Sequence, residues 1–243
     1  KASDDASGLA IADKLRTQVT SIDQGVANGN SAVSLLQIAD KSMAEQSTIL
    51  DTIKAKLIQA NTDTTSDDGR TAIAGDIAKL LEQLTNIGEQ TNYNGRQLIS
   101  GSDGATAASV HTFQVGEKNT DTITTGTINA NTTGLGLGAL STAANATLTK
   151  TIAAAQQTVV NAAISTLNSY RADIGSTQNQ VESAVRNLMT QSTNLSAAES
   201  VIRDVDYAEE SANFNKQNII SQAGSYAISQ ANTVQQNVLK LLQ

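Results

Sequence analysis

The chain has 243 residues, enough for one or two domains, and 39% of them are hydrophobic, which is sufficient for a core. The formal net charge of -7, with only 16 Lys and Arg, argues against a nucleic-acid partner because phosphate binding needs clustered cations. Cys and Trp are absent and aromatic residues make up 2%, which excludes disulfides and thiolate metal sites and disfavours an aromatic-lined ligand pocket.

A seven-residue apolar repeat predicts one long helix from about Asp4 to Gln59. The repeat is interrupted only at Gly29 and consists of Leu15, Ile22, Leu36, Met43, Leu50 and Leu57. A helix of roughly 55 residues is about 80 Å long, so the pattern indicates a rod. Within it, Gly8, Gly25 and Gly29 each cost about 1 kcal/mol relative to Ala, and we interpret them as points of close helix packing.

A turn and a shorter helix follow the predicted rod. Residues 61–69 are a turn by composition. The next apolar stripe predicts a helix that folds back on the first and ends before Tyr93-Asn94-Gly95; its residues are Ile73, Ile77, Leu80, Leu81, Leu84 and Ile87.

The middle of the chain, residues 101–141, changes to Gly, Thr, Asn and Ser. Two short alternating runs, residues 110–115 and 122–128, flank a polar segment and predict a β-hairpin. An isolated hairpin is marginally stable, so we expect it to pack against the end of the helical rod.

A second seven-residue repeat predicts a long helix from about Ala143 to Ile202. Its members are Val160, Leu167, Ile174, Val181, Leu188, Leu195 and Ile202. Beyond a charged segment the spacing resumes at Ile220, Ala227, Val234 and Leu241, in an amphipathic helix that requires a partner.

These patterns predict a mainly α fold, a long antiparallel helical rod resembling a coiled coil, with a small β-hairpin element at one end. They divide the chain into residues 1–100 for the first part of the rod, 101–141 for the hairpin region, 142–205 for the second long helix and 206–243 for the terminal helix. The seam residues of the two repeats are expected to pack against each other along the rod.

No catalytic, cofactor or metal site is predicted, and the chain is not expected to be an enzyme. His111 is the only histidine and has no ligand set around it, so we expect a structural or exposed role. The carboxylates Asp67 and Asp68, and a second group of Asp204, Asp206, Glu209 and Glu210, match no calcium loop and are interpreted as solvated or capping residues. No apolar run approaches the roughly 18 residues of a membrane span, and no secretory signal peptide opens the chain.

Several sequence blocks resemble those of bacterial flagellin, in the same order along nearly the whole chain. They are residues 1–12 (KASDDASGLAIA), Tyr93-Asn94-Gly95, residues 171–179 (RADIGSTQN), residues 206–209 (DYAE) and residues 230–239 (QANTVQQNVL). The resemblance implies a subunit that is exported through the flagellar channel, is secreted and extracellular, and polymerises head to tail into the filament for motility. Paired long helices would form the outer wall of that filament, and terminal helices its inner lining.

The resemblance also implies partners. They are other copies of the chain, an export chaperone that holds the C-terminal segment, and the filament cap and junction proteins. Compared with the family, the sequence lacks large variable outer domains and a few dozen residues before Lys1, so we expect a minimal form with its natural N-terminus removed. Without that partner helix, the terminal segment is expected to be disordered, self-associated or held by another protein; strong hydrogen-exchange protection in a lone monomer would contradict this.

Flagellins recognised by an innate immune receptor carry an Arg and a Leu on the first long helix and a Glu on the next. Those positions fall here on Thr52, Lys56 and Gln83. The changes remove a multi-donor cation, place a charge where an apolar contact is needed and remove an anionic acceptor, so weak or absent receptor activation is expected.

Two other functions remain open from the sequence alone. The hook-filament junction protein shares helical ends but usually diverges in the blocks given above. An extracellular adhesin or binding module on a helical stalk would need an exposed aromatic platform, for which only Tyr93, Phe113, Tyr170, Tyr207, Phe214 and Tyr226 are available.

Overall fold

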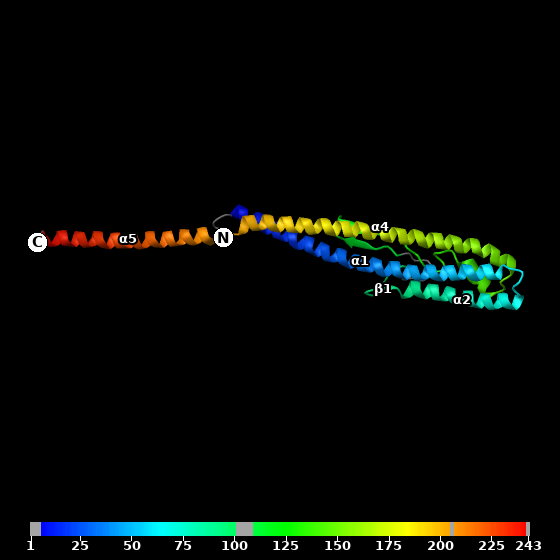
Figure 1. Ribbon diagram of the computed structural model, residues 1–243. Helices are drawn as coiled ribbons and strands as arrows, with labels where there is room; N and C mark the ends of the chain where they lie inside the picture. The colour runs from blue at the N-terminus through cyan, green and yellow to red at the C-terminus, as the bar shows by residue number, and fades with distance from the viewer. Residues whose placement is uncertain (1–5, 101–108, 205–206, 242–243) are drawn as a thin grey trace. The chain divides into compact units, whose positions relative to one another are not determined.

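The structure, a computed structural model, describes residues 6–100, 109–204 and 207–241, with side chains through Val234 (Figure 1). The described residues form five helices: α1 (Ala6–Ala60), α2 (Asp67–Gln90), α3 (Gly138–Asn145), α4 (Lys150–Arg203) and α5 (Tyr207–Leu241). Four short strands are β1 (Asn92–Tyr93), β2 (Arg96–Gln97), β3 (Thr112–Gln114) and β4 (Thr122–Thr124). The chain divides into two units: residues 16–195 form one, and the remainder forms the other.

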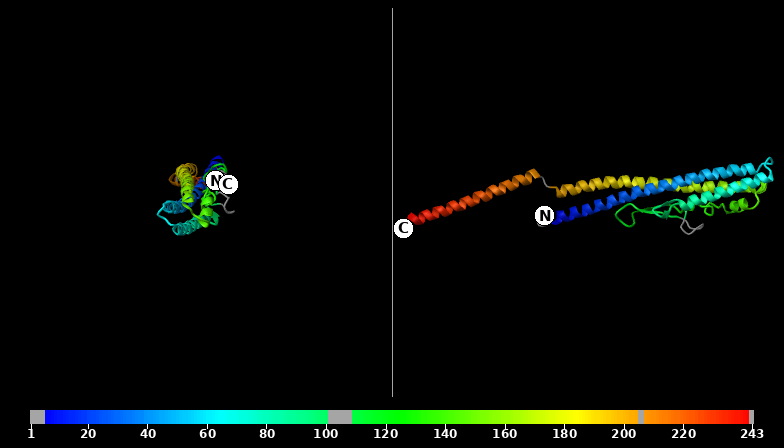
Figure 2. Two further views of the ribbon diagram at one scale, coloured as in Figure 1. Left: turned by 90° about the vertical axis from the view of Figure 1, so that its right-hand side faces the viewer. Right: turned by 90° about the horizontal axis from the view of Figure 1, so that it is seen from below.

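Within the unit of residues 16–195, α1 and α4 run antiparallel (Figure 2). Arg171 Nε donates to Asp40 Oδ1 at 2.9 Å, and Ser192 Oγ donates to Asp23 Oδ1 at 2.8 Å. The α1 residue nearer the N-terminus, Asp23, thus contacts the α4 residue nearer the C-terminus, Ser192, as antiparallel helices require. The absence of proline allows both helices to continue without losing a backbone hydrogen bond.

Helix α2 folds back on α1, as predicted. The Gln46 side chain of α1 donates to the Leu84 carbonyl oxygen at 3.0 Å, and Lys56 of α1 pairs with Asp76 of α2 at 2.8 Å. Ser66 is the N-cap of α2, because its hydroxyl accepts from the Gly69 backbone N–H at 3.1 Å.

Most residues of the two apolar repeats lie in one hydrophobic core. The buried ones are Ile22, Leu36, Met43, Leu50 and Leu57 on α1 and Val160, Leu167, Ile174 and Val181 on α4. Leu15, Leu188 and Leu195 are half-buried. Ile202 differs from the prediction, since it is 41% exposed. A seven-residue spacing identifies the apolar face of a helix, but it does not establish that another element covers that face along its whole length.

The predicted start of the second long helix at Ala143 is wrong. Residues up to Asn145 belong to the separate helix α3, which contacts α2, and α4 begins only at Lys150. Between them Ala146 leaves helical geometry, with φ -114° and ψ -105°. Leu148 in this break is 3% exposed, so its side chain joins the core. The Thr149 hydroxyl accepts from the Ile152 backbone N–H at 3.3 Å, the bond expected where a helix begins.

The predicted β-hairpin is confirmed, with shorter strands than the alternating runs. Strands β3 and β4 pair antiparallel with Phe113 opposite Ile123. The Asn28 side chain of α1 donates to the Gln114 carbonyl oxygen at 3.1 Å, which fixes the hairpin against that helix. On the other side, Asp173 of α4 accepts from the Gly126 backbone N–H at 2.7 Å.

Strands β1 and β2 form a second, two-residue hairpin that the sequence analysis did not identify. Its turn is Asn94-Gly95, with φ of 52° and 78°. Positive φ at both central residues is the geometry of the type I′ turn, for which Asn-Gly is the preferred pair.

Two glycines of α1 create space for different neighbours. A Cβ on Gly25 would lie 2.5 Å from the Val115 carbonyl oxygen of the hairpin region, and one on Gly29 would overlap Val185 Cγ2 of α4. Overpacking costs about 1–3 kcal/mol, more than the roughly 1 kcal/mol that Ala gains over Gly in a helix. Gly25→Ala and Gly29→Ala are therefore expected to lower the free energy of unfolding in chemical denaturation.

Gly75 of α2 provides the matched control, since a Cβ there meets nothing within 4 Å. Gly75→Ala should raise the free energy of unfolding by about 0.5–1 kcal/mol. Equal stabilisation by Ala at Gly25, Gly29 and Gly75 would show that the close approaches to Gly25 and Gly29 do not exist.

Candidate assembly surface

Helix α5 presents large apolar side chains to solvent. Every side chain described from Tyr207 to Val234 is exposed except the half-buried Ser211. Tyr207, the first residue of the helix, is 85% exposed. The large apolar residues that follow it are each between 52% and 74% exposed, and they are Phe214, Ile219, Ile220, Tyr226, Ile228 and Val234. A soluble chain seldom exposes so many large apolar groups on one helix unless they mark an interaction surface. We call these six residues the α5 apolar surface.

The predicted residues of this segment lie on α5, spaced by seven. Ile220 is 55% exposed, Val234 is 52% exposed, and Ala227 between them is also exposed. The side chain of Leu241, the fourth predicted residue, lies outside the described residues. Sequence analysis missed Phe214 and Ile228, which are fourteen residues apart and repeat the same heptad spacing on a neighbouring part of the helix.

Charges on α5 are confined to its first turns and its extreme end. Glu209 and Glu210 lie in the first turn, where carboxylates favour the positive end of the helix dipole. Between Lys216 and Lys240 the sequence carries no Asp, Glu, Lys or Arg, and the polar residues are Gln, Asn, Ser and Thr. Apolar packing with a neutral polar rim is therefore the interaction that this surface can make.

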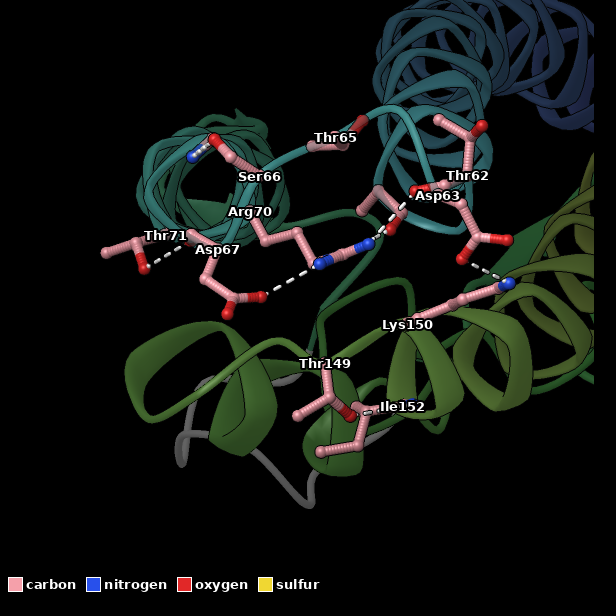
Figure 3. A network of polar contacts seen from close by, with 12 residues as sticks. Thr62, Asp63, Thr65, Ser66, Asp67, Arg70, Thr71, Thr149, Lys150 and Ile152 are labelled. Carbon is pink, nitrogen blue, oxygen red and sulfur yellow. Dashed lines mark hydrogen bonds and ion pairs between the residues drawn. The ribbon is translucent and has the colours of Figure 1, made fainter.

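At the C-terminal end of α1, a polar network joins three helices (Figure 3). The Arg70 guanidinium of α2 donates to the carbonyl oxygens of Ala60 and Thr62, both at 2.9 Å, and thereby caps the C-terminus of α1. Helix α1 has no basic residue in its own last turn, so α2 supplies the cation. Lys150 at the start of α4 pairs with Asp63 at 2.7 Å and holds the pKa of that carboxyl below its usual value.

His111 is buried and structural. Its exposed fraction is 3%, and Nε2 lies 2.8 Å from the Leu98 carbonyl oxygen, which requires the proton on Nε2. Burial lowers the pKa of the imidazole, and the nearby Arg96 lowers it further, while the bond to Leu98 raises it in part. Among the described residues, no group of three or more His, Asp and Glu is arranged to hold a metal ion.

The carboxylates considered in the sequence lie near helix ends. Asp67 and Asp68 occupy the first turn of α2, and Asp67 accepts from Arg70 at 2.9 Å. Asp204 follows the last residue of α4 and accepts from the Ser200 hydroxyl. Asp206 lies outside the described residues. The position of Asp67 and Asp68 agrees with stabilisation of a helix N-terminus by carboxylates, whereas Asp204 lies at a helix C-terminus, where a carboxylate gains nothing from the helix dipole.

Replacing His111 by Gln is expected to flatten the pH dependence of stability, because Gln can still donate to the Leu98 carbonyl. In the native chain the folded pKa lies below the ordinary 6.5, so the unfolded chain binds the extra proton first. The contribution of His111 to the free energy of unfolding is therefore fully present above about pH 6.5. It falls as the pH drops below that value, by at most about 1.4 kcal/mol per pH unit, until the pKa of His111 in the folded chain is reached.

Urea denaturation at closely spaced pH values measures this slope. Carboxyl groups change the stability only at lower pH, because the pKa values of Asp63 and Asp76 are both lowered in the folded chain. Identical slopes for His111→Gln and the unmodified chain just below pH 6.5 would rule out a buried neutral His111.

Comparison with known proteins identifies the family. The model of the bacterial flagellin N-terminal helical region matches residues 1–104, and that of the bacterial flagellin C-terminal helical region matches residues 157–242. The flagellin of Bacillus subtilis is 35% identical over 266 aligned positions, which cover 100% of this chain and 88% of that protein. The chain belongs to the flagellin family.

Solved structures agree with this assignment. The crystal structure of Bacillus cereus flagellin is 25% identical and superposes with a TM-score of 0.55, over 71% of this chain and 94% of that one. A protein described as a flagellar hook-associated protein of Vibrio parahaemolyticus gives a TM-score of 0.67, over 82% of this chain and 99% of that one. Its identity is 12%, so it shows a shared fold alone.

This flagellin is a structural subunit of the bacterial flagellar filament and polymerises with its own kind. Neither the junction protein nor the adhesin gains support, because the specific matches are to flagellins over the full chain. In the described part of the chain, no helix combines the length and apolarity needed to cross a membrane.

The three residues predicted from the sequence to occupy the immune-receptor patch lie on α1 and α2. Thr52 is exposed and its hydroxyl donates to the Thr48 carbonyl at 2.9 Å, within its own helix. Lys56 is paired with Asp76, and these residues line a shallow hollow with Lys79 and Leu80. Gln83 is exposed on α2. These three side chains are therefore a hydroxyl, a cation held in an ion pair and an amide.

Proposed function

We propose that this flagellin joins the filament by burying the α5 apolar surface against helices of neighbouring copies. The observation that carries the proposal is the exposure of six large apolar side chains on one helix. Contacts between unlike surfaces of identical subunits do not close into a ring and generate an open helical assembly. The uncharged stretch of α5 suits a desolvated inner layer, where an unpaired charge would be costly.

The tightly packed unit of residues 16–195 is proposed to supply the outer wall. It buries its apolar residues within itself, from Leu36 and Leu50 to Leu167 and Ile174. Its described surface is mainly polar. The exposed large apolar residues, which are candidates for contacts with adjacent copies, are Ile38, Ile58, Tyr93, Val110 and Met189. In this division of roles, α5 provides polymer contacts and the remaining helices provide stiffness.

A seeded polymerisation assay read by electron microscopy tests this function. The chain added to short flagellar filament seeds is expected to extend them with subunits of the same helical lattice. Failure to extend seeds, combined with binding to host glycans or surfaces, would favour the adhesin instead.

We propose that an export chaperone covers α5 before the subunit is secreted to the cell exterior and assembles. The same apolar residues would otherwise drive premature association. Contacts with the cap and junction proteins at the filament ends are proposed to use the subunit-subunit surfaces. Mixing the chain with a purified flagellin export chaperone should give a stoichiometric complex, and Ile219→Asp should weaken it. An unchanged affinity would place the chaperone elsewhere.

We also infer that the subunit acts without catalysis, since no acid-base pair or nucleophile emerges from the described residues. A screen with peptide and glycan substrates tests this, and turnover that survives purification would overturn it.

The altered receptor patch is proposed to give weak activation of the innate immune receptor. Restoring the recognised pattern by Thr52→Arg, Lys56→Leu and Gln83→Glu should raise potency in a reporter-cell dose response by about tenfold or more, since interface hot spots contribute more than about 1 kcal/mol each. A potent response to the unmodified chain would contradict this part of the proposal. The control Thr48→Arg adds the same charge one turn away on α1 and should leave potency low.

A further inference from the structure

The sequence contains two Asn-Gly pairs in contrasting environments. Asn28-Gly29 lies inside α1, and Asn94-Gly95 forms the turn between β1 and β2. Asn-Gly is chemically labile because the residue after Asn has no side chain to hinder attack by its backbone nitrogen on the Asn amide. The same dipeptide therefore offers an internal comparison of how the fold controls one reaction.

Asn94-Gly95 is open to reaction. Both residues are exposed. In the described part of the chain, neither the Asn94 side-chain amide nor the Gly95 backbone N–H is engaged in a hydrogen bond. A Cβ at Gly95 would meet nothing within 4 Å, so solvent surrounds the turn. The nucleophile and the electrophile are thus both accessible to water and base.

Asn28-Gly29 is held in place. Asn28 Nδ2 donates to the Gln114 carbonyl oxygen at 3.1 Å, while Asn28 Oδ1 accepts from Gln24 Nε2 at 2.9 Å. Gly29 is buried against Val185, and its N–H lies within the backbone hydrogen-bonding of a long helix. The nitrogen that would attack is therefore occupied, and the amide cannot rotate without breaking two bonds.

We propose that Asn94 is the preferred deamidation site of this chain and that the fold protects Asn28. The deprotonated Gly95 backbone nitrogen attacks Asn94 Cγ and forms a C–N bond. The bond from Cγ to the side-chain nitrogen breaks, and ammonia leaves after taking up a proton. Water then opens the resulting succinimide at either carbonyl and yields aspartate or isoaspartate, with no change in oxidation state.

Ring closure requires Asn94 to rotate out of its left-handed backbone conformation, so the turn must open first. The β1-β2 ladder has only two residue pairs, and hairpins this small open readily. Formation of isoaspartate lengthens the main chain by one carbon and adds a carboxylate two residues before Arg96. Arg96 donates to the Val110 carbonyl oxygen at 2.9 Å, so the product is expected to loosen this link between the turn and the β3 region.

Ageing of the purified chain in mildly alkaline buffer containing H₂¹⁸O tests the proposal. Peptide mass spectrometry would quantify isotope-labelled product at each Asn, and an isoaspartate-specific methyltransferase would identify the isoaspartate fraction. Product at Asn94 is expected to exceed that at Asn28 by at least roughly tenfold. That ratio corresponds to a difference of about 1.4 kcal/mol between the free energies of local opening at the two sites. Comparable rates at the two positions in the folded chain would overturn the proposal.

Two controls separate the fold from the local sequence. In concentrated urea the two Asn-Gly pairs should react at similar rates, and a persistent tenfold difference there would refute protection by the fold. Asn94→Gln removes the five-membered ring route and should eliminate the product at this turn while the thermal unfolding midpoint stays close to that of the parent chain.

Discussion

Replacing Ile220 by Asp is expected to stop the chain from polymerising. Ile220 is 55% exposed in the single chain, so the substitution should not disturb the fold of the subunit. In a filament that buries the α5 apolar surface, an unpaired carboxylate costs at least about 3 kcal/mol. That cost corresponds to a rise of roughly a hundredfold in the critical concentration for elongation. Sedimentation of filaments across a range of subunit concentrations measures it.

Ser229→Asp provides the matched control on the same helix. Ser229 is exposed and lies nine residues from Ile220, about 180° around the helix and midway between the directions of Phe214 and Tyr226. The same added charge should there shift the critical concentration less than at Ile220. Equal losses from Ile220→Asp and Ser229→Asp would indicate a general effect of charge, and no loss from either would remove α5 from the polymer contact.

The second large effect is expected in the core. Leu50 is completely buried in the cluster shared by α1, α2 and α4, and Leu50→Ala should lower the free energy of unfolding by about 2–5 kcal/mol. Ile58 lies on the same helix but is 54% exposed, so Ile58→Ala should change it by less than about 0.5 kcal/mol. Chemical denaturation monitored by circular dichroism compares them. Similar losses for Leu50→Ala and Ile58→Ala would contradict the assigned inner face of α1.

The repeat of apolar residues allowed the long helices and their inner faces to be predicted, because seven-residue spacing specifies one side of a helix. It could not reveal the break between α3 and α4, where Leu148 turns into the core although Ala and Thr continue a plausible helical composition on both sides. Nor could it show that Gln46 is buried. That side chain bridges Leu84 of α2 and Ala130 of the following region, a contact between segments far apart in sequence.

The hairpin formed by β1 and β2 has a recognisable sequence signal, but that signal was interpreted only as the end of a helix. Asn94-Gly95 is the pair that a type I′ turn favours, but the flanking strands are too short to show an alternating pattern. Gly25 and Gly29 were correctly interpreted as packing positions. Gly25 packs against the hairpin region and Gly29 against α4. These neighbours depend on tertiary structure and could not be predicted from the spacing of apolar residues.

The candidate surface was predicted in part. Ile220, Ala227 and Val234 follow the heptad repeat, whereas Phe214 and Tyr226 were considered only as aromatic residues for a rival function. Their shared exposure on α5 becomes evident only when burial is known, because the same sequence pattern would arise in a helix already covered by its own chain.

Hydrogen exchange of α5 in monomer and filament tests the central claim most directly. Backbone amides from Ile219 to Val234 are expected to exchange quickly in the isolated subunit, since every side chain described in that range is exposed, and to become strongly protected after polymerisation. The core around Leu50 should be protected in both states and serves as the internal reference. Equal exchange of α5 in monomer and filament would contradict the proposal that this helix forms the subunit contact.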